Sequence, residues 1–425
     1  MEMYDESKII ELLQRRIIEE WDIKIKSDTI YNSYENYSLA AGLPGVILLL
    51  SEINYDEYKD QIDNYLIYIV KILSNNGIVS SSLYSGAAGL ALSLLHLANK
   101  DKKYSDLINS IDNYICYSIE DTIHQIDADT LSPLNYDIIE GISGILVYLL
   151  IKDDEKFNDI ISDIINKLID LFVNNHGLPP YYVKSQNQLS IIESEIFPKG
   201  CLNLGVAHGL AGVGIMVAIA CIKGFTNSKT KKFLKNIIKI YDRLEIADGT
   251  NQYKWKSAIN MDEYSKGSDL DNKEYFRDAW CYGSPGISLL YLYVGIFLKD
   301  QKLVEKSKNI LIASLECPVG VQSSILCHGY SGLYEIGFLY KQIFKEEPWD
   351  RYLSIIKEKI LSSFTISKKF GFEEDNYYSD GNEGSVKFLD GSLGIVLTLL
   401  HIQNKYVKTY WREALLIFDN LTIEN

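Results

Sequence analysis

A G-x-x-G motif followed by an apolar run occurs seven times along the chain. Successive motifs begin 44 to 74 residues apart. The apolar runs, such as residues 145–150, are hydrophobic on nearly every side, which indicates helices that are buried all round. One G-x-x-G motif carries little information, but seven that each open an apolar helix predict a repeat protein. The first glycines of the motifs are Gly42, Gly86, Gly141, Gly209, Gly283, Gly329 and Gly391.

The segments between these apolar runs are amphipathic. Residues 157–172 and 231–244 carry apolar side chains at steps of three and four, with charged residues between them, as surface helices do. Each repeat therefore consists of one outer amphipathic helix and one inner buried helix. Seven such units close most simply into a ring, where the glycines let helix starts approach closely. The sequence predicts a single all-α domain over residues 1–425, an α/α toroid of seven inner and seven outer helices.

Two long spacings between repeats indicate insertions. Residues 176–183 and 188–192 resemble short strands around a polar turn, so we expect a small β-containing subdomain over residues 174–204. Residues 247–274 are polar and low in periodicity, which predicts a long loop.

Composition and charge narrow the class of protein. Hydrophobic residues make up 47% and charged residues 23% of the chain, which is typical of a globular protein with a large core. The net charge of −15 disfavours nucleic acid as a partner and would suit a cationic peptide. Six cysteines are too few for a disulfide framework in 425 residues, and the first residues do not resemble a signal peptide. We therefore expect a reduced, cytoplasmic protein.

One apolar stretch could be mistaken for a membrane span. Residues 205–222 contain only His208 as a strongly polar member. The first third of this stretch is rich in glycine and turn-like, which leaves too short a helix to cross a bilayer. We interpret it as a buried core helix.

The turns before two neighbouring repeats carry candidate metal ligands. Cys281 and Cys327 both stand two residues before the first glycine of their motif, and His328 follows Cys327. Equal positions in a ring of repeats lie at one end of the barrel, and adjacent helices are ~8–10 Å apart, so the two turns can share an ion. Zinc prefers thiolate and imidazole ligands, and three of them leave a fourth position for substrate or water. The alternative is that both thiols are ordinary buried cysteines.

Four other polar residues in equivalent turns are the candidate catalytic groups. His208 suits general acid/base catalysis, since imidazole titrates near neutral pH, although it could also be a histidine hydrogen-bonded at a helix start. Asp137 could orient such a histidine or cap a helix. Arg277 could hold a developing negative charge or pair with an outer carboxylate. Tyr282 could donate a hydrogen bond into the site or merely pack.

These motifs resemble those of the lanthionine synthetase C-like family, specifically its stand-alone lanthipeptide cyclases. The resemblance rests on Trp-Cys-Tyr-Gly at 280–283, Cys-His-Gly at 327–329, Ala-His-Gly at 207–209 and Tyr-Asp at 136–137, and the seven glycine repeats extend it over nearly the whole chain. It implies an α/α toroid with a small inserted domain. It further implies zinc at Cys281, Cys327 and His328, and functional roles for His208, Asp137, Arg277 and Tyr282.

The reaction implied by the resemblance is an intramolecular Michael addition. Cysteine thiolates of a dehydrated lanthipeptide precursor, leader plus core, attack dehydroalanine or dehydrobutyrine to form lanthionine or methyllanthionine rings of a lantibiotic. The resemblance also implies a complex with a dehydratase and an ABC exporter, which would hold the protein at the inner face of the membrane.

Three other functions remain open at this stage. The first is a related zinc protein that binds glutathione or another thiol without forming rings. The second is a carbohydrate-active enzyme, since α/α toroids host these too, but such enzymes rest on paired carboxylates, whereas this site is built on thiols. The third is a scaffold without metal.

Overall fold

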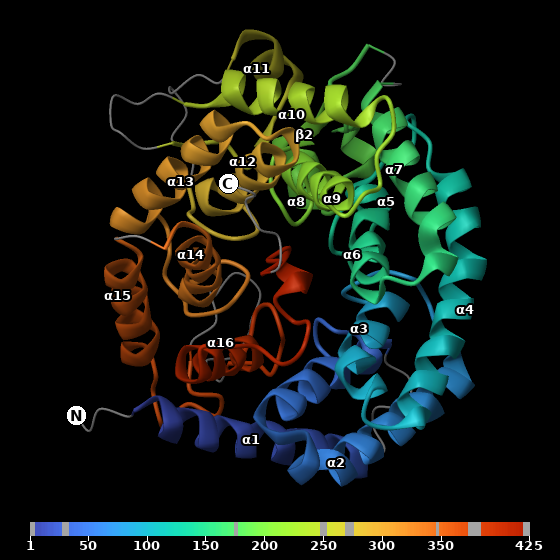
Figure 1. Cartoon of the computed structure of the whole chain (residues 1–425), viewed down its shortest axis with the longest axis vertical. Coiled ribbons are helices and arrows are strands. Elements are labelled where there is room, and N and C mark those ends of the chain that lie inside the picture. The colour runs from blue at the N-terminus through green and yellow to red at the C-terminus, as the bar shows by residue number, and fades with distance from the viewer. Residues whose placement is uncertain are drawn as a thin grey trace. The chain divides into compact units, whose positions relative to one another are not determined.

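The structure is a computed structural model, and it describes residues 5–27, 34–173, 177–246, 253–267, 276–345, 348–372 and 384–419. Within these residues, helices make up most of the chain and strands very little. Apolar and amphipathic helices alternate in sequence, and Figure 1 shows the helices in chain order along the colour gradient.

Each G-x-x-G motif opens an apolar helix within the described residues. In α9, every residue from Leu210 to Cys221 is buried. At 13 residues, α9 is about 20 Å long, which is shorter than the apolar thickness of a bilayer. None of the helices described has the length and apolar character needed to span a membrane. The apolar helices are the first part of α2 (Leu43–Asn76), α3 (Ala87–Ala98), α6 (Ile142–Lys152), α9 (Leu210–Ile222), α12 (Ser284–Leu298), α14 (Tyr330–Phe344) and α16 (Ser392–Asn404).

The intervening helices are amphipathic. In α10, Phe233, Ile237 and Tyr241 are buried at steps of four, whereas Lys231 and Lys235 are exposed. The first repeat has no loop between its two helices, because α2 changes direction at Asn54, whose φ of −164° and ψ of 99° are not helical. The amphipathic helices are α1 (Glu6–Lys26), the second part of α2, α4 (Lys102–Gln125), α7 (Asn158–Val173), α10 (Thr230–Leu244), α13 (Gln301–Glu316) and α15 (Trp349–Ser362).

The chain divides into two compact units. The first contains Met1–Ile115, Gln322–Lys341 and Glu346–Ile417, and the second contains Cys116–Val321, Gln342–Lys345 and the residues after Ile417. In the first unit, α1 packs against α16, so helices from opposite ends of the sequence lie side by side (Figure 1). In the second unit, α12 packs against α9 and α13, and α10 packs against α9.

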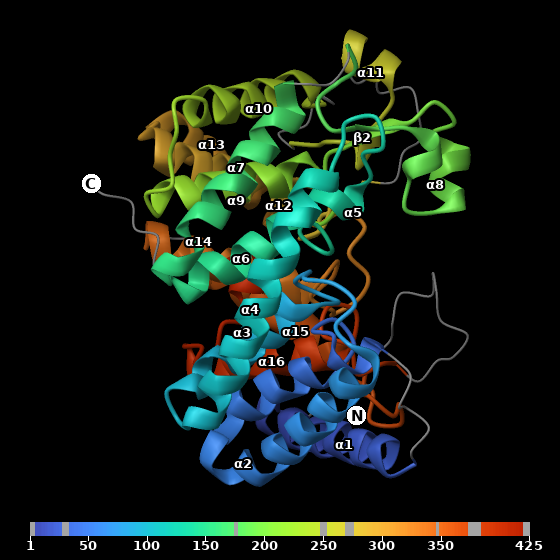
Figure 2. The same cartoon turned by 90° about the vertical axis from the view of Figure 1, so that its right-hand side faces the viewer.

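A three-stranded antiparallel sheet interrupts the helices of the second unit. Its order is β1 (Tyr182–Val183), β2 (Cys201–Asn203) and β3 (Ala258–Ile259), and Leu202 pairs with both Tyr182 and Ile259. The predicted strand over 176–183 contains β1, although residue 176 lies outside the described residues. Figure 2 shows two short helices, α8 (Ile191–Ile196) and α11 (Met261–Lys266), near β2.

Two sequence-based predictions for this region are wrong. Residues 188–192 are not a strand, because Ser190 caps a helix there by accepting a hydrogen bond from the N–H of Glu193 (3.1 Å). The predicted loop over 247–274 contains both β3 and α11. The side chain of Asn260 caps α11, and the Glu263 carboxylate accepts a hydrogen bond from the Asn260 N–H, which forms a capping box. Residues 247–252 and 268–274 of that predicted loop lie outside the described residues.

In four of the repeats, the second glycine of the motif is required by close backbone packing. A Cβ atom at Gly89, Gly212, Gly286 or Gly394 would lie only 1.8–2.3 Å from the carbonyl oxygen of the residue six positions earlier. The turn before each of these helices therefore folds back onto the first helical turn, with a backbone carbonyl filling the space of a side chain. This contact explains the second glycine of these four motifs.

We predict that Gly212→Ala lowers the free energy of unfolding by about 1–3 kcal/mol, because its Cβ would meet the Val206 carbonyl oxygen at 2.1 Å and backbone must shift. Gly214→Ala in the same helix is the control. Its Cβ would meet mainly the terminal carbon of Leu290, a side chain that can move, so a change within about 1 kcal/mol is expected. Chemical denaturation measures both, and equal effects would contradict the backbone explanation.

Candidate active site

The turn before α12 carries Arg277, Cys281 and Tyr282. A hydrogen bond from the Ala279 N–H to the Tyr282 carbonyl oxygen (3.1 Å) closes it. Gly283 has a φ of 104°, and a Cβ there would lie 1.8 Å from the Arg277 carbonyl oxygen, so this position requires glycine. The tight turn fixes where the three candidate side chains begin.

A second turn, over residues 203–208, holds this first turn in place. The Cys281 carbonyl oxygen accepts hydrogen bonds from the N–H groups of Val206 (2.8 Å) and Ala207 (3.3 Å). Cys281 itself is only 5% exposed. These bonds set the position of His208, the next residue of the second turn, relative to Cys281.

The turn before α14 carries Cys327 and His328. The Cys327 N–H donates to the Leu389 carbonyl oxygen (3.0 Å), and the Tyr330 N–H donates to the Ser323 carbonyl oxygen (3.0 Å). The His328 side chain is 19% exposed, and its Nδ1 lies 4.0 Å from a carboxylate oxygen of Asp390.

Cys281, Cys327 and His328 form a cluster that could hold a metal ion. Each offers one ligand atom, and these atoms lie within 4.8 Å of one another. Among the described residues, this is the one group of cysteine, histidine or acidic side chains whose ligand atoms lie close enough together to share a metal ion. Two sulfur atoms and one nitrogen atom are a donor set for a soft or borderline metal rather than for calcium or magnesium.

His208 and Asp137 form a close pair. The His208 Nδ1 lies 2.6 Å from the Asp137 Oδ2. The other oxygen of Asp137 accepts hydrogen bonds from the N–H groups of Glu140 (2.7 Å) and Gly141 (2.8 Å). The Asp137 carboxylate therefore closes the turn before α6 with one oxygen and contacts the His208 ring with the other; α6 itself begins after Gly141 without a side-chain cap.

The environment of His208 favours its protonated form. Burial, the largest influence, acts to lower the pKa of His208, but the hydrogen bond and the charge of Asp137 outweigh it and raise that pKa above its ordinary value. Asp137 is completely buried, whereas the His208 side chain is 25% exposed. Because an ionised carboxylate only accepts hydrogen bonds, Nδ1 carries a proton and Nε2 is the nitrogen available for proton transfer.

Tyr282 contacts a residue that the sequence did not single out. The phenol oxygen of Tyr282 lies 3.0 Å from the Asn203 side-chain nitrogen. Asn203 is the last residue of β2, inside the insertion, so no repeat position pointed to it. The sequence feature that could have pointed to Asn203 is local: an asparagine two residues before a glycine, Gly205, is typical of a turn.

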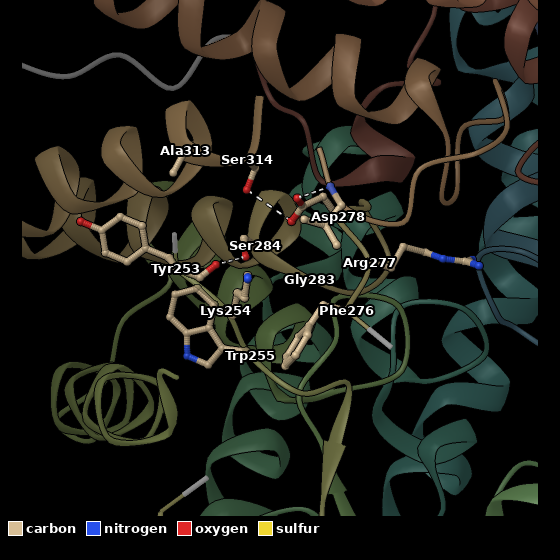
Figure 3. Close-up of a pocket in the computed structure, with 11 residues that line it drawn as sticks. Tyr253, Lys254, Trp255, Phe276, Arg277, Asp278, Gly283, Ser284, Ala313 and Ser314 are labelled. Atoms are coloured by element: carbon tan, nitrogen blue, oxygen red, sulfur yellow. Dashed lines mark hydrogen bonds between the residues drawn. The ribbon is translucent and has the colours of Figure 1, made fainter. Parts of the chain in front are cut away.

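Arg277 lines a small pocket beside the turn before α12, together with Asp278 and Lys254 (Figure 3). Figure 3 shows its guanidinium pointing away from Lys254 and Ser284. Asp278 is nearly buried, and burial raises its pKa to about 6 despite a hydrogen bond from the Val319 N–H (2.9 Å).

Comparison with known proteins places this chain in a family. Residues 33–416 match the family described as "Lanthionine synthetase C-like protein". A relative from Lactococcus lactis subsp. lactis, "Nisin biosynthesis protein NisC", is 42% identical over 409 residues, covering 95% of this chain and 94% of the relative. The solved structure of "Nisin cyclase" has a TM-score of 0.86 at 40% identity, over 96% of this chain and 97% of that one.

The chain therefore belongs to the lanthionine synthetase C-like family, the class of lantibiotic cyclases. Within that class, it is a homologue of the nisin cyclase along nearly its whole length. The predicted fold class, an α/α toroid with a small sheet, is confirmed by this structural match and by the sheet itself.

We predict that Asp137→Asn and Asp137→Ala separate the two roles of Asp137. Asparagine keeps an oxygen for the Glu140 and Gly141 N–H groups, whereas alanine leaves both donors without this acceptor and should cost about 1–2 kcal/mol of unfolding free energy at any pH.

The charge lost in Asp137→Asn should matter only in acid. Because the folded-state pKa of His208 is raised, the ion pair stabilises the fold fully below the unfolded pKa of about 6.5, and this stability fades as pH rises through the folded pKa. Chemical denaturation below and above that range measures the difference. An Asp137→Asn effect that grows with rising pH would contradict the pairing.

Proposed function

We propose that this protein is a zinc-dependent lanthipeptide cyclase, which forms lanthionine and methyllanthionine thioether rings in a dehydrated precursor peptide. The observation that carries the proposal is the cluster of Cys281, Cys327 and His328, whose ligand atoms lie within 4.8 Å of one another. The family relationship over nearly the whole chain supports the same reaction.

The three clustered residues fit a zinc ion. Thiolate and imidazole bind Zn²⁺ at about 2.3 Å and 2.0 Å, which requires the ligand atoms to approach to within a few ångströms of one another. Zinc bound there would lower the pKa of a peptide cysteine thiol, so that it is a thiolate at neutral pH.

The reaction adds an S–H group across a carbon–carbon double bond. The peptide thiolate forms a bond to Cβ of the dehydro residue, the π bond breaks, and its electron pair moves onto the carbonyl oxygen as an enolate. A proton delivered to Cα then completes the thioether. The net change needs neither an oxidant nor a reductant.

The residues near Cys281 supply the proton and the charge that this reaction needs. We assign His208 as the acid, because Asp137 holds its Nδ1 and leaves Nε2 to transfer the proton. Arg277 would stabilise the negative charge on the enolate oxygen, and Tyr282 would donate a hydrogen bond into the site. A related protein that only binds thiols would need none of these groups, so formation of a thioether separates the two functions.

The partners follow from the substrate. The precursor must first be dehydrated and later exported, so we propose that the cyclase works in the cytoplasm in a complex with a dehydratase and an ABC exporter. The net charge of −15 suits a cationic precursor.

We predict that the purified protein contains about one Zn²⁺ per chain, from three ligands and one exchangeable position. Cys281→Ala or Cys327→Ala should lose most of the zinc while the helices still fold, because neither thiol belongs to the apolar helices that form the core. Cys221→Ala in α9 is the matched control and should retain the metal. Elemental analysis measures zinc, and full retention in both ligand variants would overturn the assignment.

We predict that His208→Asn keeps its zinc but slows cyclisation by ~10²–10⁴-fold, since the enolate must then take its proton from water. The assay is thiol consumption on a synthetic peptide with one cysteine and one dehydroalanine, with metal analysis of the same preparation. His124→Asn on α4, whose side chain is 77% exposed, is the control. A wild-type rate for His208→Asn would assign the acid to another group, whereas loss of zinc would make His208 part of the metal site.

A further inference from the structure

Asn203 connects the inserted sheet to the candidate active site. It ends the central strand β2, and it is only 7% exposed. Its side-chain oxygen accepts a hydrogen bond from the Gly205 N–H (2.9 Å), and its side-chain nitrogen lies 3.0 Å from the phenol oxygen of Tyr282. Both ends of one amide group are therefore engaged, one by backbone and the other by a candidate functional residue.

The Gly205 N–H fixes which way round the amide of Asn203 lies. A backbone N–H can only donate, so the atom of Asn203 that faces it must be the oxygen. The NH₂ group then faces Tyr282, and an amide NH₂ can only donate. The phenol oxygen of Tyr282 is therefore the acceptor in this contact, and its own hydrogen must point away from Asn203.

The ring of Tyr282 is also held against the same turn. A Cβ at Gly205 would lie 2.5 Å from two ring carbons of Tyr282 and 2.7 Å from the Cys281 carbonyl oxygen. The ring thus rests directly on the backbone of Gly205. With the ring seated there and its oxygen bound by Asn203, few orientations remain for the hydroxyl hydrogen.

We propose that Asn203 is a positioning residue that turns the Tyr282 hydroxyl hydrogen toward the bound peptide, so that Tyr282 donates a hydrogen bond to the substrate. This inference rests on the proposed cyclase function. Tyr282 touches the substrate, whereas Asn203 acts only through Tyr282. The hydrogen bond would stabilise the enolate oxygen as the S–Cβ bond forms, and the proton that completes the thioether still goes to Cα.

Asn203→Asp tests this proposal against a purely structural role. An aspartate keeps an oxygen for the Gly205 N–H, so the turn is preserved. Its second oxygen faces Tyr282 and can only accept, so the phenol must turn its hydrogen toward position 203 and away from the substrate. If Asn203 served only to close the turn, this variant would behave as wild type.

We expect Asn203→Asp to lower kcat on the peptide with one cysteine and one dehydroalanine by the same factor as Tyr282→Phe, on the order of 10²-fold. KM and zinc content should stay unchanged. Adding Asn203→Asp to Tyr282→Phe should cost nothing further, because the hydroxyl is already gone. Asn260→Asp is the matched control, since it adds the same charge after β3 and keeps the cap of α11.

A second measurement does not depend on activity. In protein labelled with ¹⁵N-asparagine, the side-chain signal missing from Asn203→Asp identifies Asn203. Its amide proton should shift in Tyr282→Phe, where the acceptor is lost, and stay in place in Tyr264→Phe.

The outcomes separate this inference from the proposed function. Wild-type kcat in Asn203→Asp, or equal losses with and without the Tyr282 hydroxyl, would overturn the positioning role. So would an Asn203 amide signal that does not respond to Tyr282→Phe. If wild-type protein with zinc forms no thioether, the cyclase proposal fails, while the amide signal still decides which way the Asn203 side chain lies.

Discussion

The site depends on a backbone contact that four of the repeats share. In these repeats, the carbonyl oxygen of a turn residue packs against a helix position where only glycine leaves room. The contact pins the turn to the first residues of an apolar helix, which is itself buried. Residues just before the motif, such as Cys281 and His208, are thereby attached to buried helices of the core. The chemistry of the site is built on turns, but on turns that have little freedom to move.

Repeat position explains how much of the site could be predicted from sequence. Cys281 and Cys327 stand at equivalent positions before two motifs, with His328 beside Cys327, and this register is what made the three residues candidate metal ligands. The same reasoning linked His208 to Asp137, since both precede a motif and the structure joins them by a 2.6 Å contact. In a regular repeat that closes into a ring, residues at equal offsets from the motif are expected at the same end of the barrel, so the repeat pattern alone supplied the prediction.

The inserted region could not be predicted in the same way. Asn203 and the strand β3 belong to stretches without periodicity, and two-residue strands have too little pattern to be recognised. The second predicted strand was wrong because a local cap at Ser190 starts a helix in an apolar stretch. These local hydrogen bonds outweigh the weak β propensity of a few isoleucines. The residues that tune a site can thus lie outside the motifs that reveal it.

The division of the chain into two units bears on how it is made. The second unit consists almost entirely of one continuous stretch, Cys116–Val321, whereas the first needs α1 and α16 from opposite ends of the sequence. During synthesis the middle of the chain can complete its core while the N-terminal helices still lack their partners. Helices α1 and α2, which both pack against α16, keep part of their apolar surface exposed until the ribosome has produced α16. During synthesis, the protein is therefore most prone to aggregate through its first hundred residues, until α16 has left the ribosome.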